Sequence, residues 1–235
     1  MINNINLAVD CMGSETSLNE ILEGINESAL RNENLFFSLF GKSVEIDKLL
    51  KNISPLNIRS EVINCDEEIL MSDKPTDAIK LKKNSSMQLS IDHVSSGKSH
   101  AVLSCGNTGA LMAISLLKLR TVASIKRPSI ASIWPNIKGE SIVLDLGANI
   151  KNDPTSLVDN AILGSALAKI LLSKDEPSIG LLNVGIEEMK GNENVQKASE
   201  VLTEMNNKKQ LNYYGFIEGA DISKGKTSVV VTDGF

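Results

Sequence analysis

The chain has 235 residues, which is enough for one large domain or two small ones and for a substantial buried core. Hydrophobic residues make up 42% of the sequence and charged residues 23%, a balance that fits a globular protein and excludes a disordered chain. A net charge of -5 with only 3% aromatic residues argues against nucleic acid as a partner, because such surfaces need basic groups and stacking rings.

Cysteine usage and the apolar segments indicate the compartment. Cys11, Cys65 and Cys105 are an odd number without a C-x-x-C pair, so we expect small buried thiols in a reducing compartment. The N-terminus lacks the basic and apolar regions of a signal peptide. Polar residues interrupt Leu157–Leu172, which falls short of the ~18–20 apolar residues of a membrane span. A cytoplasmic protein is predicted, with this segment as a buried or interface helix.

Strand-like and helix-like patterns alternate through the first half of the chain. The predicted strands are Ile5–Asp10, Leu35–Phe40, Ile58–Asn64 and Ala101–Cys105. The predicted helices are Leu18–Leu30, Val44–Leu50, Lys74–Lys83, Ser86–Ser96 and Thr108–Leu119.

The second half begins differently. Ser129–Trp134 and Ser141–Asp145 read as an antiparallel hairpin, joined by five residues that include Pro and Gly. A helix should begin at Asp153-Pro154, because Asp caps helices and Pro suits the first helical position. The remaining predicted elements are strands Ile179–Asn183, Leu211–Ile217 and Ser228–Thr232 and helix Val195–Met205.

This alternation predicts an α/β fold with a mixed, mostly parallel sheet and helices on both faces. No repeat or linker divides the chain, so we expect one domain over residues 1–235. Ligands of such sheets bind at the carboxyl ends of the strands. The turns that follow those strands are therefore the place to look for a functional site.

The strongest local feature is the turn Ser104–Ala110, which follows a strand and opens a helix. Gly106 and Gly109 allow the backbone to approach a ligand closely, and Asn107 or Thr108 can cap the helix. The free N–H groups of the first helical turn would then attract an anion. The alternative is an ordinary turn whose polar residues only cap.

Three further segments carry polar groups that could bind a ligand, and each also has a simpler structural explanation. Leu144–Asn149 places Asp145 and Asn149 after a strand, either to orient a ligand or to form an Asx turn. Asn183–Asn192 is either a charged rim or a solvated loop, and the lysine run from Lys74 is either an anion site or a solvated helix face.

Gly41-Lys42-Ser43 and Asp10–Gly13 lack the glycine spacing of nucleotide-binding loops. Neither histidine, His93 nor His100, lies in a triad or metal-site pattern.

Taken in order, these segments resemble the bacterial phosphate acyltransferase (PlsX) family over the whole chain. The segments that carry the resemblance are Ala8–Gly13, Asp73–Pro75, Lys82–Met87, Ser104–Met112, Arg127-Pro128, Leu144–Asn149, Leu181–Gly185, Lys190–Asn192, Glu218-Gly219 and Asp233–Phe235.

The resemblance implies a fold of the isocitrate/isopropylmalate dehydrogenase type. It also implies transfer of a fatty acyl group from acyl carrier protein to inorganic phosphate, which gives acyl phosphate for phospholipid synthesis. Homodimers, a membrane glycerol-phosphate acyltransferase as partner and a place at the inner face of the membrane belong to the same expectation. No cofactor or metal ion is expected, since the sequence has no clustered carboxylate set for a divalent ion.

Roles follow for residues within the matching segments. The residues expected to act in catalysis are Asn107, Lys190 and Asp145. The residues expected to bind substrate are Lys74, Ser86, Gly106, Thr108, Gly109, Asn149 and Asn192. Within these sets, Asn107, Thr108 and Gly109 should cradle phosphate, Lys74 and Lys190 should supply charge, and Asp145 and Asn149 should orient the reacting groups.

Two departures from the family pattern keep alternatives open. Ala220 replaces a usual Arg, and the chain stops after Asp233–Phe235, whereas family members continue for about another third of this length. We therefore expect the family's C-terminal part, with its helices for dimerisation and membrane contact, to be absent here. The alternatives are an enzyme like phosphotransacetylase that uses acyl-CoA, and a degenerate module that holds acyl carrier protein without catalysis.

Overall fold

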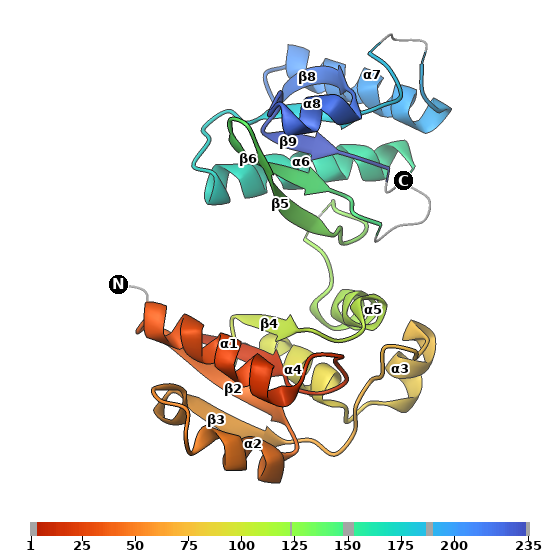
Figure 1. The fold of residues 1–235 in the computed structure, drawn as a ribbon. Helices are drawn as coiled ribbons and strands as arrows, with labels where there is room; N and C mark the ends of the chain where they lie inside the picture. Colours follow the sequence, from red (N-terminus) through yellow and green to blue (C-terminus); the bar gives the residue numbers. More distant parts are fainter. Residues whose placement is uncertain (1–3, 123, 148–152, 187–189, 234–235) are drawn as a thin grey trace. The chain divides into compact units, whose positions relative to one another are not determined.

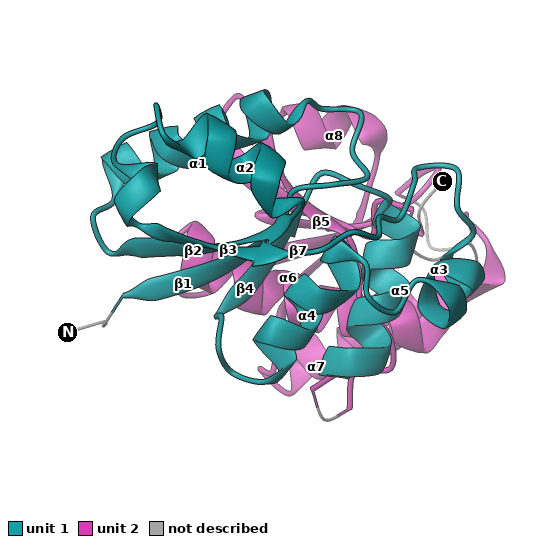
Figure 2. Cartoon of the chain, turned by 90° about the horizontal axis from the view of Figure 1, so that it is seen from below, with its two compact units in different colours: residues 1–120 teal, residues 121–235 magenta. Residues whose placement is uncertain are grey.

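A computed structural model describes residues 4–122, 124–147, 153–186 and 190–233. The chain folds into two compact units, residues 1–120 and 121–235, each with its own sheet (Figures 1 and 2). The sequence predicts one sheet, so this point is corrected, because the segment after the helix that ends at Leu119 starts a separate sheet. A single functional domain over 1–235 stays a prediction.

The first unit contains a four-stranded parallel sheet, in the order β3-β2-β1-β4. Its strands are β1 (Ile5–Asp10), β2 (Leu35–Gly41), β3 (Ser60–Asn64) and β4 (Ala101–Ser104). Its helices are α1 (Leu18–Arg31), α2 (Ser43–Leu50), the 3-10 helix η1 (Leu56–Ile58), α3 (Pro75–Leu81), α4 (Ser86–Ser95) and α5 (Thr108–Leu119).

Alternation along the strands of the first unit divides its core into two layers. Val9 and Leu39 point to the face that α1 and α2 cover, whereas Ala8 and Phe40 point to the face that α4 covers. Figure 2 shows α1 and α2 on one side of the sheet and α4 and α5 on the other. β1 continues on one side to β2 and β3, while β4 pairs on its other side, so the strand order reverses between β1 and β4. Ligands of open α/β sheets bind at this switch point.

The second unit contains a five-stranded mixed sheet, in the order β5-β6-β9-β7-β8. Its strands are β5 (Ala131–Asn136), β6 (Gly139–Leu144), β7 (Ser178–Leu182), β8 (Asn212–Ile217) and β9 (Val229–Val231). Its helices are α6 (Pro154–Leu171), α7 (Glu193–Asn207) and α8 (Gly219–Ser223). Only β5 runs antiparallel among the strands of this sheet, which confirms the predicted hairpin.

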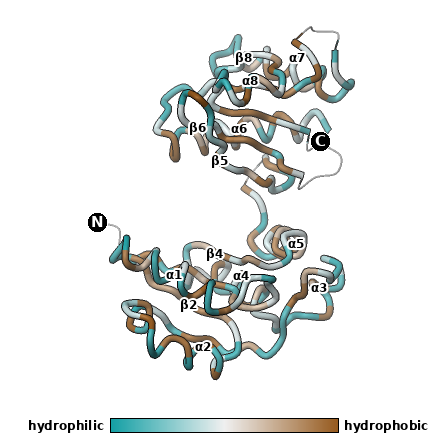
Figure 3. The backbone as a smooth tube through the Cα atoms, viewed as in Figure 1, coloured by the Kyte–Doolittle hydropathy of each residue, from teal (hydrophilic) through white to brown (hydrophobic). Residues whose placement is uncertain are grey.

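The core of the second unit also has two layers. Ile142 and Leu144 of β6 pack with α6 and α7 on one face, while Val143 packs with Ile217 and Ile222 on the other. β9 and the second half of β6 are hydrophobic (Figure 3). The predicted mixed, mostly parallel α/β fold with helices on both faces is therefore confirmed.

Local signals explain most of the helix starts. Asp153 caps α6 with Pro154 at its first position, as predicted, and Ser17 forms a capping box with Glu20 at α1. The hairpin connection is shorter than predicted, because Asn136 already pairs with Gly139. No helix within the described ranges is long and apolar enough to cross a membrane.

Gly164 allows α6 to lie directly on the sheet. A Cβ at this position would stand 2.5 Å from Cγ1 of Val229 and 2.8 Å from Cδ2 of Leu144, both of which are buried. We expect Gly164→Ala to lower the free energy of unfolding by about 1–3 kcal/mol, since a packed core resists an added methyl group. Urea unfolding followed by circular dichroism measures this change.

Gly24→Ala is the control within a helix. No atom lies within 4 Å of a Cβ built at this position in α1, so the substitution should stabilise the chain by about 0.5–1 kcal/mol. A Gly164→Ala chain as stable as the Gly24→Ala chain would contradict the packing argument.

Candidate functional site

The turn between β4 and α5 depends on the side chain of Asn107. Its Oδ1 accepts the N–H of Ala110 at 3.0 Å, which caps the helix as predicted. Its amide group donates to the backbone oxygens of Leu70, Met71 and Asp73 at 3.2, 3.0 and 2.9 Å. Asn107 is only 8% exposed, so its side chain holds the turn rather than facing solvent.

The segment that receives the Asn107 amide is itself closed by an ion pair. Oδ2 of Asp73 accepts the N–H of Leu70 at 2.8 Å and the ammonium of Lys82 at 2.6 Å. Lys82 also donates to the backbone oxygen of Glu68 at 2.8 Å. These bonds lower the pKa of Asp73, with the Lys82 hydrogen bond as the largest cause. Lys82 is thus engaged in structure, whereas Lys74 is exposed.

Lys74 lies beside the start of α5. The residue before it, Asp73, accepts the Asn107 amide, and a Cβ at Gly109 would stand 3.1 Å from Cγ of the residue after it, Pro75. Lys74 therefore sits between two residues that contact the turn. The sequence prediction pairs Lys74 with this turn, and the structure brings the two together.

The first turn of α5 presents free donors. Among the described residues, the backbone N–H groups of Thr108 and Gly109 have no hydrogen-bond acceptor, and both residues are exposed. These groups carry the positive end of the helix dipole. Lys74 is exposed between two residues that contact this turn, so this end of the first sheet is electrostatically suited to an anion.

A buried carboxylate lies next to this turn, and the sequence analysis did not select it. Asp10 ends β1 and is 2% exposed. Its carboxylate accepts hydrogen bonds from the hydroxyls of Ser86 at 2.5 Å and Ser104 at 2.7 Å. The hydroxyl of Ser104 in turn accepts the N–H of Gly106 at 3.1 Å. Ser86 and Gly106, both predicted to bind substrate, are buried within this network.

The carboxyl edge of the second sheet carries the other predicted residues. Asp145 follows β6, is fully buried, and accepts the N–H of Ile130 at 3.0 Å through Oδ1. Its own N–H lies 3.4 Å from the oxygen of Thr232, which follows β9. Asp145 therefore joins three segments at this edge, while Asn149 lies outside the described residues.

The loop before α7 is anchored at the same edge. The side chain of Asn183 donates to the backbone oxygen of Lys190 at 2.9 Å, and Asn192 caps α7 by accepting the N–H of Val195. Asn192 also donates to Asp233 at 3.2 Å, which links the start of α7 to the segment that follows β9. Lys190 is exposed at this rim.

The thiols and histidines differ in their surroundings. Burial raises the pKa of Cys11 to about 12 and that of Cys65 to about 11, so both thiols are protonated at neutral pH. Cys105 is exposed, which corrects the prediction that all three are buried. His93 contacts Ser99 and the edge of Phe40 and has a structural role, as predicted.

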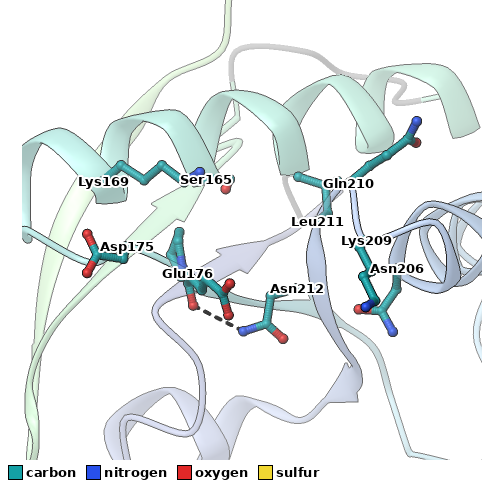
Figure 4. A pocket seen from close by; sticks show the side chains of 10 residues that line it. Ser165, Lys169, Asp175, Glu176, Asn206, Lys209, Gln210, Leu211 and Asn212 are labelled. Atoms are coloured by element: carbon teal, nitrogen blue, oxygen red, sulfur yellow. Dashed lines mark hydrogen bonds between the residues drawn. The ribbon is translucent and has the colours of Figure 1, made fainter.

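Hollows in the surface lie on both edges of the sheets. One of about 180 Å³ lies after β1 and is lined by residues that include Gly13, Lys42 and Glu68. Another of about 450 Å³ lies before β7 and β8, at the amino edge of the second sheet, where Asn212 donates to the oxygen of Glu176 (Figure 4). The second hollow is thus on the edge opposite Asp145 and Lys190.

Comparison with known proteins places this chain in a family. The model of a family described as fatty acid synthesis protein matches residues 5–235. A phosphate acyltransferase from Azorhizobium caulinodans is 43% identical over 98% of this chain, and one from Sinorhizobium fredii is 41% identical over the same share. The chain belongs to the phosphate acyltransferase family. It spans 65% and 67% of the length of these two members.

Solved structures confirm the fold. A phosphotransacetylase from Streptococcus pyogenes matches 98% of this chain and 77% of its own length, with a TM-score of 0.72 and 17% identity. A 4-hydroxythreonine-4-phosphate dehydrogenase from Burkholderia phymatum matches 98% of this chain and 80% of its own, with a TM-score of 0.56 and 12% identity. At such identities the likeness establishes the fold alone.

The ion pair that closes the segment beside Asn107 is testable by pH titration. Because Lys82 lowers the pKa of Asp73, the closed segment is favoured above the unfolded value of 3.8 and is lost as the pH falls through the folded pKa. We expect Lys82→Met to move the pKa of Asp73 upward, toward 3.8. A carbon-13 NMR titration of the carboxyl group measures the change.

Lys83→Met is the matched control, since Lys83 is the exposed neighbour of Lys82 and makes no ion pair within the described part of the chain. An equal shift of the Asp73 pKa in the Lys83→Met and Lys82→Met chains would show that the overall charge of the protein, and not the contact with Lys82, sets this pKa.

Proposed function

We propose that this chain takes part in transferring a fatty acyl group from acyl carrier protein to inorganic phosphate, which gives acyl phosphate for phospholipid synthesis. The observation that supports this most directly is the start of α5. Two exposed N–H groups, of Thr108 and Gly109, lie beside Lys74 at the switch point of a parallel sheet, in a member of the phosphate acyltransferase family.

The reaction does not require a nucleophilic side chain from the protein. An oxygen of the phosphate dianion attacks the thioester carbonyl, the new C–O bond forms and the C–S bond breaks. The departing thiolate takes up the proton that the phosphate carried. Phosphate is already a nucleophile at neutral pH, so the main tasks are to position the anion and to stabilise the oxyanion that develops on the carbonyl.

Residues at the start of α5 suit the positioning task. The N–H groups of Thr108 and Gly109 hold the phosphate oxygens, and the ammonium of Lys74 balances their charge. Asn107 acts by holding the turn open, because its own side chain is engaged with four backbone groups. The backbone at Gly106 lets the turn pass close to Ser104 without a side chain in the way.

Residues of the second unit are proposed for charge and orientation. Lys190 is an exposed cation at the carboxyl edge, on a loop that Asn183 and Asn192 anchor. Asp145 supports that edge by accepting the N–H of Ile130. Asn149 follows in the same segment, and its role as an orienting group stays a prediction.

The proposed partners follow from the family. They are acyl carrier protein as the donor, a membrane glycerol-phosphate acyltransferase as the consumer of the product, and a second copy of the protein in a homodimer. The proposed place is the cytoplasm, at the inner face of the membrane. Since the chain spans 65% of the first of the relatives above, the activity of the whole protein is part of this proposal.

A second candidate is acyl transfer to or from a coenzyme A thioester. The fold similarity to a phosphotransacetylase from Streptococcus pyogenes favours it. The two candidates share the phosphate site and differ only in the carrier of the acyl thioester. A comparison of the two donors therefore separates them.

The activity is expected to depend on both phosphate and the acyl carrier protein. The purified chain with acyl-acyl carrier protein and phosphate should give acyl phosphate, which hydroxylamine traps as a coloured hydroxamate. No hydroxamate should form without phosphate. Faster turnover with acyl-CoA would favour the second candidate, and no product with either donor would favour a non-catalytic module that binds acyl carrier protein.

Lys74 is expected to contribute to the affinity for phosphate. Lys74→Met removes an ammonium group beside the first N–H groups of α5 and should raise the KM for phosphate about tenfold, as expected for a lost charge-assisted bond. Lys83→Met removes an equally exposed ammonium group, from beyond the end of α3, and is the control. Equal KM values for the two variants would contradict the role of Lys74.

A further inference from the structure

The carboxylate of Asp10 lies at the point where the order of the first sheet reverses. Asp10 is the last residue of β1 and stands directly beside Ser104, the last residue of β4, in the parallel register. The turn that leads to α5 begins at Ser104. Asp10 is therefore next to the proposed phosphate site, although it is 2% exposed and does not face solvent.

Three donors from different segments converge on this carboxylate. Oδ1 accepts the hydroxyl of Ser86, at the start of α4, and the N–H of Met12, at 2.5 and 3.3 Å. Oδ2 accepts the hydroxyl of Ser104 at 2.7 Å. The carboxylate thus connects the ends of β1 and β4 with the first turn of α4.

The bond to Asp10 decides how Ser104 is oriented. A hydroxyl has one hydrogen, and in Ser104 it points to Oδ2 of Asp10, which leaves the oxygen lone pairs for the N–H of Gly106 at 3.1 Å. That second bond fixes the backbone of the turn just before Thr108 and Gly109. A chain of two hydrogen bonds therefore leads from Asp10 to Gly106, two residues before the first free N–H group of α5.

The burial of this carboxylate is unfavourable. Desolvation raises the pKa of Asp10 above 3.8, even though Ser86 and Ser104 act to lower it. Nearby Glu68 also raises it, and no cation is among the causes of the shift. A buried carboxylate that is held by hydroxyls and not by a cation adds little to stability, so a functional reason for its presence is favoured.

We infer that Asp10 is a positioning residue of the proposed phosphate site. Through Ser104 and Gly106 it holds the first N–H groups of α5 in the orientation that receives the anion. This inference rests on the proposed function and adds a residue that does not touch the substrate.

The test measures the KM for phosphate apart from kcat, in the hydroxamate assay with the full chain. Asp10→Asn and Ser104→Ala should each raise the KM for phosphate about tenfold, in line with the loss of one hydrogen bond, and change kcat less than about threefold. Ser104→Thr keeps the hydroxyl, so it should restore a KM close to that of the unchanged chain.

Ser38→Ala is the matched control. Like the half-buried Ser104, Ser38 belongs to the first sheet and donates to a carboxylate, Glu61, at 2.7 Å, but it is fully buried in the middle of β2. This variant should lose stability and keep its KM for phosphate. It separates a role in positioning from a general effect of removing a buried hydroxyl.

The outcomes distinguish the proposed function from the positioning role of Asp10. An unchanged chain that forms no acyl phosphate overturns the proposed function. An active chain whose Asp10→Asn and Ser104→Ala variants keep their KM for phosphate overturns the positioning role, as does a Ser38→Ala variant with an equally raised KM. If Asp10→Asn does not fold, the comparison of Ser104→Ala with Ser104→Thr decides.

Discussion

The side chain of Asn107 joins two segments of the first unit that are more than thirty residues apart. An amide has one oxygen to accept and two hydrogens to donate, and here the oxygen caps α5 while the NH₂ group donates to the carbonyl groups of Leu70, Met71 and Asp73. These bonds hold residues 70, 71 and 73 against the turn that opens α5. The position of α3, of Lys74 and of the exposed helix start all depend on this one side chain.

The two sheets use a buried aspartate in the same way. Asp10 is the last residue of β1 and Asp145 comes directly after β6, and both accept hydrogen bonds from neighbouring segments at the carboxyl edge. In each unit the aspartate is almost inaccessible, while the cations Lys74 and Lys190 are exposed. Buried acceptors thus connect the segments at each carboxyl edge, and the lysines proposed to bind the ligand lie at the surface.

Local signals in the sequence predict most of the fold but only part of the site. Periodicity and caps locate α5 and α6, because these depend on neighbouring residues. The short helix α8 has no such period and is missed. Asp10 is missed as well, although it stands at the end of a buried strand like Asp145, because its partners Ser86 and Ser104 are 76 and 94 residues away. Long-range hydrogen bonds of this kind leave no local pattern.

The strand order of the second sheet has a consequence for synthesis of the protein. Of the described strands of this sheet, β9 comes last in the sequence, yet it lies between β6 and β7 in the middle of the sheet. During translation, β6, β7 and β8 emerge before the strand that must separate β6 from β7. The described strands of this sheet can reach their order only once residues 229–231 have left the ribosome, whereas the four described strands of the first unit can pair as soon as β4 has emerged.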